Sequence, residues 1–315
     1  MRAPALAALA LTCGTLVAAP SARAETYYLT VAGLGGDADY EQRFRALASD
    51  LDRILKAADS TNHVVTLSGD TATRAHLTES LQSIADQANA DDDFVLILIG
   101  HGSYDGQQYK FNLVGPDISA SALAQLCNKI AARHQLIVNT TSSSGASIAA
   151  LAHEGRAVIA ATKTGSEKNA TVFARYWVDA LRDSTADVDK NDSISALEAF
   201  EYATAKTAAF YESQKRLATE HPIFADSGSA AALRSASLNT GAGKSLSSFV
   251  LIRLGASGLA AGDPAKRALL AKKEQLENQI DALKYQRAAM SPEDYKRQLT
   301  EALVALAKVQ EDLEK

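Results

Sequence analysis

The sequence predicts an α/β protein in which a mostly parallel sheet is flanked by helices and is followed by an antiparallel helical hairpin of coiled-coil type. Strand-like and helix-like segments alternate over residues 27–253, which is typical of a parallel sheet covered by helices. Two apolar segments, residues 94–99 and 135–139, each end in a polar turn that contains glycine. From residue 264 onward the composition shifts to Lys, Glu, Gln, Ala and Leu.

The first 24 residues have the features of a secretory signal peptide. Arg2 supplies a positive charge, an apolar core rich in Ala and Leu extends to about Pro20, and small residues precede Glu25. This core is too short and too rich in alanine to favour a membrane span. Lipoprotein cleavage before Cys13 is the alternative, although Thr12 fits that site poorly. We therefore expect a secreted or periplasmic mature chain without a transmembrane segment.

A mature chain of about 290 residues can bury a sizeable core. Removing the leader leaves Cys127 alone, in a segment with helical spacing, so no intramolecular disulfide is expected. The formal net charge of -5 and the lack of a basic cluster argue against a nucleic-acid partner.

The main domain is expected over residues 25–254, and its elements follow from the period of the apolar residues. The expected main strands are residues 27–32, 63–67, 94–99, 135–139, 156–161 and 247–253, with a short extra strand at residues 109–113. The expected helices are residues 38–57, 73–88, 119–132, 146–153, 169–182 and 194–219.

Residues 255–263 are rich in Gly and Ala and predict a flexible linker, and residues 264–315 predict the helical hairpin. Apolar residues recur there at intervals of three, four or seven positions on both sides of Met290. Ser291 is a natural N-cap, and Pro292 suits the first position of a helix. The hairpin either folds back on its own domain or offers a surface for an oligomer or a partner.

The two polar turns hold residue types that could perform chemistry. His101 and Gly102 follow the third main strand, and Ser142 to Gly145 follow the fourth. In an open α/β sheet, turns at the ends of neighbouring strands form the crevice where ligands bind and catalytic groups collect. The sequence therefore predicts a base, His101, close to a hydroxyl group, that of Ser142.

This pair of turns resembles the caspase/legumain class of cysteine peptidases, and in particular the legumain-type bacterial homologues. In that class, His-Gly ends one strand and Cys-x-Ser-Gly ends the next. The resemblance covers about residues 27–254. It implies that His101 stands at the base position, Gly102 in the turn that holds the oxyanion, and Ser142 in place of the nucleophilic cysteine. Thr140 stands where an acidic residue is usual in the family.

The change from sulfur to oxygen at residue 142 has a chemical cost. A thiol with a pKa near 8.5 ionises readily, whereas a serine hydroxyl needs a base oriented by a third group during attack. Asp105 is close to His101 in sequence, but it lies in a turn. We therefore expect a catalytically silent module that binds or scaffolds a peptide or protein. The alternative is an active Ser142/His101 hydrolase, either a peptidase or an esterase.

A second constellation lies at residues 187–198. Five oxygen-bearing residues occupy positions 1, 3, 5, 7 and 12 of an EF-hand-like calcium loop: Asp187, Asp189, Asn191, Ser193 and Glu198. Asp192 stands at position 6, where glycine is usual. Aspartate tolerates the left-handed conformation better than most residues, so the turn is strained rather than forbidden. No cofactor is required by this sequence, and calcium is a candidate. Ser195 and Glu198 also form a capping-box pattern, which would start a helix without any metal.

Overall fold

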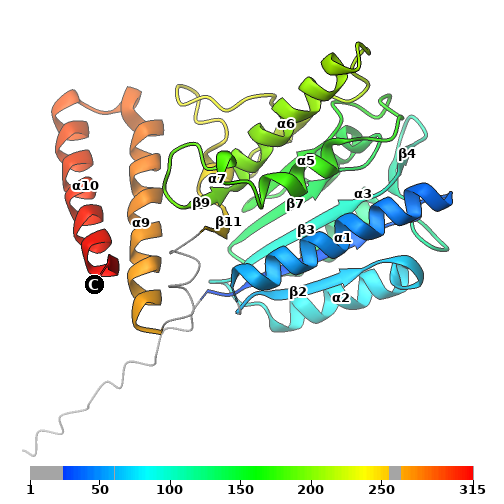
Figure 1. Cartoon of the computed structure of the whole chain (residues 1–315), viewed down its shortest axis with the longest axis horizontal. Helices are drawn as coiled ribbons and strands as arrows, with labels where there is room; N and C mark the ends of the chain where they lie inside the picture. The colour runs from blue at the N-terminus through cyan, green and yellow to red at the C-terminus, as the bar shows by residue number, and fades with distance from the viewer. Residues whose placement is uncertain (1–23, 60, 255–263, 315) are drawn as a thin grey trace, which may run out of the picture.

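A computed structural model describes residues 24–59, 61–254 and 264–314 (Figure 1). The predicted signal peptide up to residue 23 and the predicted linker at residues 255–263 lie outside the described residues.

The centre of the protein is a six-stranded sheet with the strand order β10-β8-β7-β3-β1-β2. Its strands are β1 (Thr26–Ala32), β2 (His63–Leu67), β3 (Asp93–Ile99), β7 (His134–Asn139), β8 (Arg156–Ala160) and β10 (Ile223–Ala225). All neighbouring strands are parallel except β10, which runs antiparallel to β8. The predicted mostly parallel sheet is confirmed, and its first five main strands lie within one residue of their expected bounds.

Helices cover both faces of this sheet (Figure 1). One face packs against α1 (Ala38–Ala58), α5 (Phe173–Ala180) and α6 (Ala196–Ser213), and the other against α2 (Arg74–Gln87), α3 (Ala120–Cys127) and α4 (Ile148–Leu151). Strand β3 contributes side chains to both cores, because successive side chains of a strand point to opposite faces of the sheet. Val95, Ile97 and Ile99 enter the first core, whereas Phe94, Leu96 and Leu98 enter the second. Burying an aliphatic or aromatic side chain of this size contributes about 1.5–3 kcal/mol.

Two smaller sheets lie outside the central one. Strands β4 (Gly102–Tyr104), β5 (Tyr109–Phe111) and β6 (Ile118–Ser119) form a three-stranded antiparallel sheet that begins directly after His101. Strand β9 (Ser193–Ser195) pairs antiparallel with β11 (Val250–Arg253). The remaining helical turns are η1 (Gly69–Thr71), η2 (Ser144–Ser147), η3 (Ser184–Ala186) and α7 (Lys244–Ser247).

The prediction that residues 247–253 form the last main strand of the central sheet was wrong. Residues 250–253 form a strand, but it pairs with β9 and not with the central sheet. The sixth central strand is instead β10, which has only three residues and therefore too little apolar alternation to stand out in the sequence. The expected helix at residues 194–219 is also shorter, because β9 takes its start and α6 ends at Ser213.

The C-terminal helical hairpin is confirmed. Helices α9 (Pro264–Gln286) and α10 (Pro292–Glu314) run antiparallel and pack against each other, with the turn η4 (Arg287–Ala289) between them (Figure 1). The Ser291 hydroxyl accepts a hydrogen bond from the Asp294 backbone N–H at 3.1 Å, as expected of an N-cap. The hairpin lies beside β9, β11 and α7, with α9 as the inner helix (Figure 1).

Candidate functional site

The two polar turns meet at the carboxyl edge of the central sheet. Strands β3 and β7 are parallel neighbours, with Leu98 opposite Asn139. The Thr140 backbone N–H donates to the Leu98 carbonyl at 3.0 Å, which continues the pairing beyond the end of β7. The next residues, His101 with Gly102 and Thr141 with Ser142, therefore lie side by side.

The Ser142 hydroxyl is bonded entirely to the backbone of Gly102. It accepts from the Gly102 N–H at 3.1 Å and donates to the Gly102 carbonyl at 2.9 Å. Only 2% of Ser142 is exposed. The hydroxyl thus joins the two turns, and the Gly102 N–H, which the resemblance assigns to the oxyanion turn, is bonded to the serine itself.

The His101 ring lies against helix α1. Its centroid is 4.8 Å from that of Tyr40 and 5.1 Å from that of Phe44, both in edge-on geometry. Burial lowers the pKa of His101, and a hydrogen bond with the Gly35 backbone and the charge of Asp37 offset this only in part. The imidazole is therefore favoured in its neutral form, the form that can accept a proton.

The described residues give His101 neither of the partners that a serine hydrolase needs. No hydrogen bond joins its ring to Ser142 among them, and no carboxylate bonds to the ring within the same ranges. The Asp105 carboxylate instead accepts from the backbone N–H groups of Gln107 and Gln108, and this closes its own turn. The structure therefore brings Ser142 against Gly102 but does not join Ser142, His101 and Asp105 into a triad.

The loop after β8, residues 162–168, covers the serine turn. The Ser143 N–H donates to the Glu167 carbonyl at 2.8 Å, and the Gly145 N–H donates to the Thr162 hydroxyl at 2.9 Å. Gly145 has no room for a side chain, because a Cβ there would lie 2.4 Å from the Lys163 backbone. Ser143 and Ser144 are fully buried as a result.

The half-buried side chains of Glu167 and His221 form a contact that holds this loop in place. The Glu167 carboxylate lies 2.5 Å from the His221 Nδ1 and accepts from the Lys163 backbone N–H at 2.8 Å. Nothing in the sequence indicates this pair, because the two residues are 54 positions apart and neither belongs to a motif.

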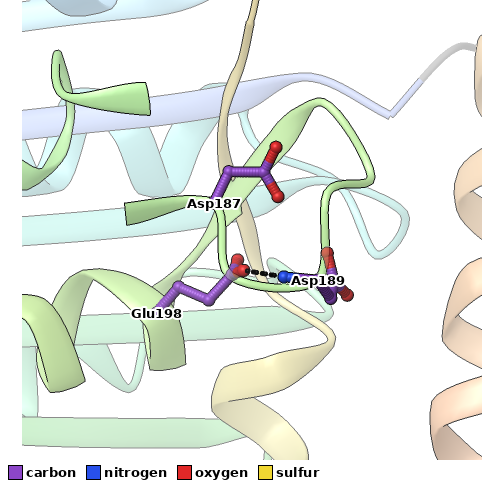
Figure 2. Close-up of side chains that lie close together, drawn as sticks. All are labelled: Asp187, Asp189 and Glu198. Carbon is purple, nitrogen blue, oxygen red and sulfur yellow. Dashed lines mark hydrogen bonds between the residues drawn. The ribbon is translucent and has the colours of Figure 1, made fainter. Parts of the chain in front are cut away.

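The acidic loop at residues 187–198 brings three carboxylates together. Ligand oxygens of Asp187, Asp189 and Glu198 lie within 4.8 Å of one another (Figure 2). The Asp187 carboxylate accepts from the backbone N–H groups of Asn191 and Asp192, which bends the loop around it. Asp192 has φ 64°, the left-handed conformation expected at this position.

Helix α6 begins inside this loop with the predicted capping box. The Ser195 hydroxyl accepts from the Glu198 N–H, and the Glu198 carboxylate accepts from the Ser195 N–H at 2.9 Å. The other oxygen of Glu198 accepts from the Val188 N–H at 2.9 Å, and the Asp189 N–H lies 3.5 Å from it (Figure 2). Partial desolvation and the neighbouring charge of Glu198 raise the pKa of Asp189 to about 6. The capping box and the carboxylate cluster therefore use the same side chain, that of Glu198.

Asn191 and Ser193 are turned toward each other within the loop. The Asn191 side-chain oxygen accepts from both the backbone N–H and the hydroxyl of Ser193, at 2.8 and 2.6 Å. Ser193 is also the first residue of β9, so its pairing with Arg253 of β11 holds the middle of the loop in place.

The overall arrangement defines an α/β protein with a mostly parallel central sheet flanked by helices. No family model matches the sequence, and no curated protein matches it either. Solved structures similar to the chain include the protein GSU0716 from Geobacter sulfurreducens, at 14% identity and a TM-score of 0.43, covering 66% of this chain and 94% of that one. The Drosophila initiator caspase Dronc is similar at 11% identity and a TM-score of 0.42, covering 67% of this chain and 82% of that one.

Within the ranges that the structure describes, no helix is both long enough and apolar enough to cross a membrane.

Proposed function

We propose that this chain is a catalytically silent protein of caspase/legumain-like fold that binds or scaffolds a peptide or protein ligand. The observation that carries the proposal is the state of the Ser142 hydroxyl, which is buried, donates its proton to the Gly102 carbonyl and accepts from the Gly102 N–H. A nucleophilic serine must give its proton to a base during attack, and it must be reachable by the substrate. Ser142 meets neither condition as it stands.

The position of His101 also favours this proposal. A catalytic base has to lie within hydrogen-bond reach of the proton that it removes, and a third group has to orient it. His101 has Tyr40 and Phe44 as its ring neighbours, and its hydrogen bond goes to the Gly35 backbone. The competing proposal is a Ser142/His101 hydrolase. It requires the Ser142 hydroxyl to break its hydrogen bonds to Gly102 and the His101 ring to move within hydrogen-bond reach of that hydroxyl.

A fluorophosphonate probe distinguishes the two proposals, because it labels activated serines irrespective of substrate. We expect no labelling of the wild-type protein and no cleavage of peptides after Asn, Asp, Arg or Lys. Labelling of the wild type that disappears in both Ser142→Ala and His101→Ala would establish the hydrolase instead.

The variant Ser142→Cys tests whether the missing sulfur is the sole defect. We expect no gain of peptide cleavage, because Thr140 also departs from the family turn and the buried residue 142 faces Gly102 rather than His101. Cleavage gained by this single change would show that the crevice and His101 are competent.

We also propose that residues 187–198 bind calcium weakly, through Asp187, Asp189, Asn191, Ser193 and Glu198. The specific support is that three carboxylate ligand groups already lie within 4.8 Å and that Asp192 adopts the required left-handed turn. Calorimetry of the chelator-treated protein with calcium tests the proposal, with Asp187→Asn as the variant expected to lose binding. Absence of both heat and a melting shift at millimolar calcium would leave the capping box as the whole explanation of the motif.

The predicted leader further supports an exported protein, in the periplasm or outside the cell, because residues 1–24 combine charge, apolar core and small-residue site in the order that export requires. Fractionation of cells that produce the full chain, followed by mass determination of the mature N-terminus, tests this part of the proposal.

A further inference from the structure

The face that α9 turns toward the domain is mostly polar, with Leu270 as a buried apolar residue on it. Lys273, Glu274, Glu277, Asn278 and Asp281 line the recesses between α9 and the acidic loop, and their spacing of three or four places them on one side of the helix. The buried apolar residues Leu276, Ile280 and Leu283 follow a second stripe, and α9 packs extensively on α10. The hairpin therefore holds together by apolar contacts, whereas it meets the domain largely through charged groups.

One of these charged groups is almost completely buried. Lys273 is 6% exposed, and its ammonium donates to the Asn191 carbonyl of the acidic loop. The same ammonium lies 3.6 Å from the Glu277 carboxylate. Lysine is among the residues most rarely buried, and burial is tolerated only where the charge is paired and hydrogen-bonded.

The surroundings of Lys273 are strongly acidic. A cavity of about 190 Å³ between the loop, α6 and α9 is lined by six carboxylates: Asp189, Glu198, Glu201, Glu274, Glu277 and Asp281. No cationic residue is among the described residues that line this cavity. In the adjoining recess the cationic residues are Lys273 and Arg253, and Arg253 forms an ion pair with Glu274.

We propose that the α9–α10 hairpin is a releasable arm, latched to the domain by insertion of the Lys273 ammonium against the acidic loop. Glu274 is paired with Arg253, and Asp281 with Lys284. Without the Lys273 ammonium, the Asn191 carbonyl would lose this donor and Glu277 would face the charge of Asp189 with no cation beside it, in a medium of low dielectric. A polar interface of this kind within one chain permits relative movement, unlike a large apolar one. The latch does not depend on whether Ser142 is active.

The test compares Lys273→Met with the matched control Lys272→Met. Lys272 is the adjacent residue on α9, but it is exposed, and its ammonium reaches only Gln275 on the same helix. Spin labels at Arg53→Cys on α1 and Lys308→Cys on α10, in a Cys13→Ser background, report the distance between domain and hairpin. Cys127 is fully buried and stays unlabelled.

We expect a narrow distance distribution for the labelled parent protein and for Lys272→Met, and a broad, longer one for Lys273→Met. Lys273→Arg keeps the charge and should retain most of the narrow population. A narrow distribution for Lys273→Met would overturn the latch, because docking would then not need the ammonium. Equal release by Lys273→Met and Lys273→Arg would also overturn it, because shape rather than charge would then hold the arm. Far-UV circular dichroism of each variant confirms that both helices of the hairpin remain folded before distances are compared.

Discussion

At the scale of single residues, the Ser142 hydroxyl acts as a structural bridge. It bonds both polar groups of the Gly102 backbone and so joins the turn after β3 to the turn after β7. Gly102 itself is confined, because a Cβ there would lie 2.4 Å from the Ser142 carbonyl oxygen. The Ser142 side chain thus holds two turns of this chain together.

We therefore predict that Ser142→Ala lowers the free energy of unfolding by about 1–3 kcal/mol, because it leaves the partly buried N–H and carbonyl of Gly102 without their Ser142 partner. Urea denaturation measures the change. The control is Ser103→Ala on β4, an exposed serine one residue beyond Gly102, which should change stability by less than about 0.5 kcal/mol. Equal stability of Ser142→Ala and wild type would contradict the bridging role.

At the scale of elements, the acidic loop depends on a backbone conformation that most side chains avoid. Asp192 has φ 64°, its N–H donates to the Asp187 carboxylate, and its carbonyl accepts from the Leu254 N–H. The residue therefore links the loop to the end of β11, and its left-handed geometry is fixed from both sides.

From this geometry we predict that Asp192→Val lowers the free energy of unfolding by about 1–2 kcal/mol, since a β-branched residue is poorly tolerated at positive φ. Asp192→Gly should be nearly neutral or slightly stabilising. Thermal denaturation of the two variants side by side checks the prediction. A similar loss in both would show that the carboxylate, rather than the backbone angle, is what the loop needs.

The docked helix α9 gives a prediction about pH. Burial raises the pKa of Glu277 to about 7, reinforced by the charges of Asp189 and Glu274 and opposed by Lys273. The folded chain thus holds this proton more tightly than the unfolded chain, where the pKa is 4.5. The free energy of unfolding should therefore fall as the pH rises from about 4.5 to about 7, and the loss should be complete above that range.

Accordingly, Glu277→Gln should remove this part of the pH dependence and stabilise the protein at pH 8, by about 1 kcal/mol after allowance for the partial solvation of the site. Melting curves at pH 5 and pH 8 measure the effect. Glu301→Gln on the exposed side of α10 is the control and should leave the pH profile unchanged. A Glu277→Gln profile that parallels the wild type would place the responsible proton on another group.

At the scale of the whole molecule, the long helices and strands could be predicted from the sequence. So could the contact between the turns that follow β3 and β7. Five of the central strands have strong apolar patterns. The polar turns that end β3 and β7 predicted that these two strands are neighbours, as the strand order shows. Strands β9 and β10 escaped prediction because three residues carry too little pattern. The side on which the His101 ring lies, and the contact between Glu167 and His221, depend on packing between distant segments and could not be predicted from local sequence.

The strand order also has a consequence for how the molecule forms. After β1 and β2 have paired, every later central strand joins the same free edge, in the order β3, β7, β8 and β10. A chain that emerges with its N-terminus first can therefore add each new strand to an edge that is already present, without waiting for a later segment to fill a gap. Growth then stops at β10, which has only three residues and whose Phe224 backbone N–H and carbonyl are both bonded to Leu233 on the outer side.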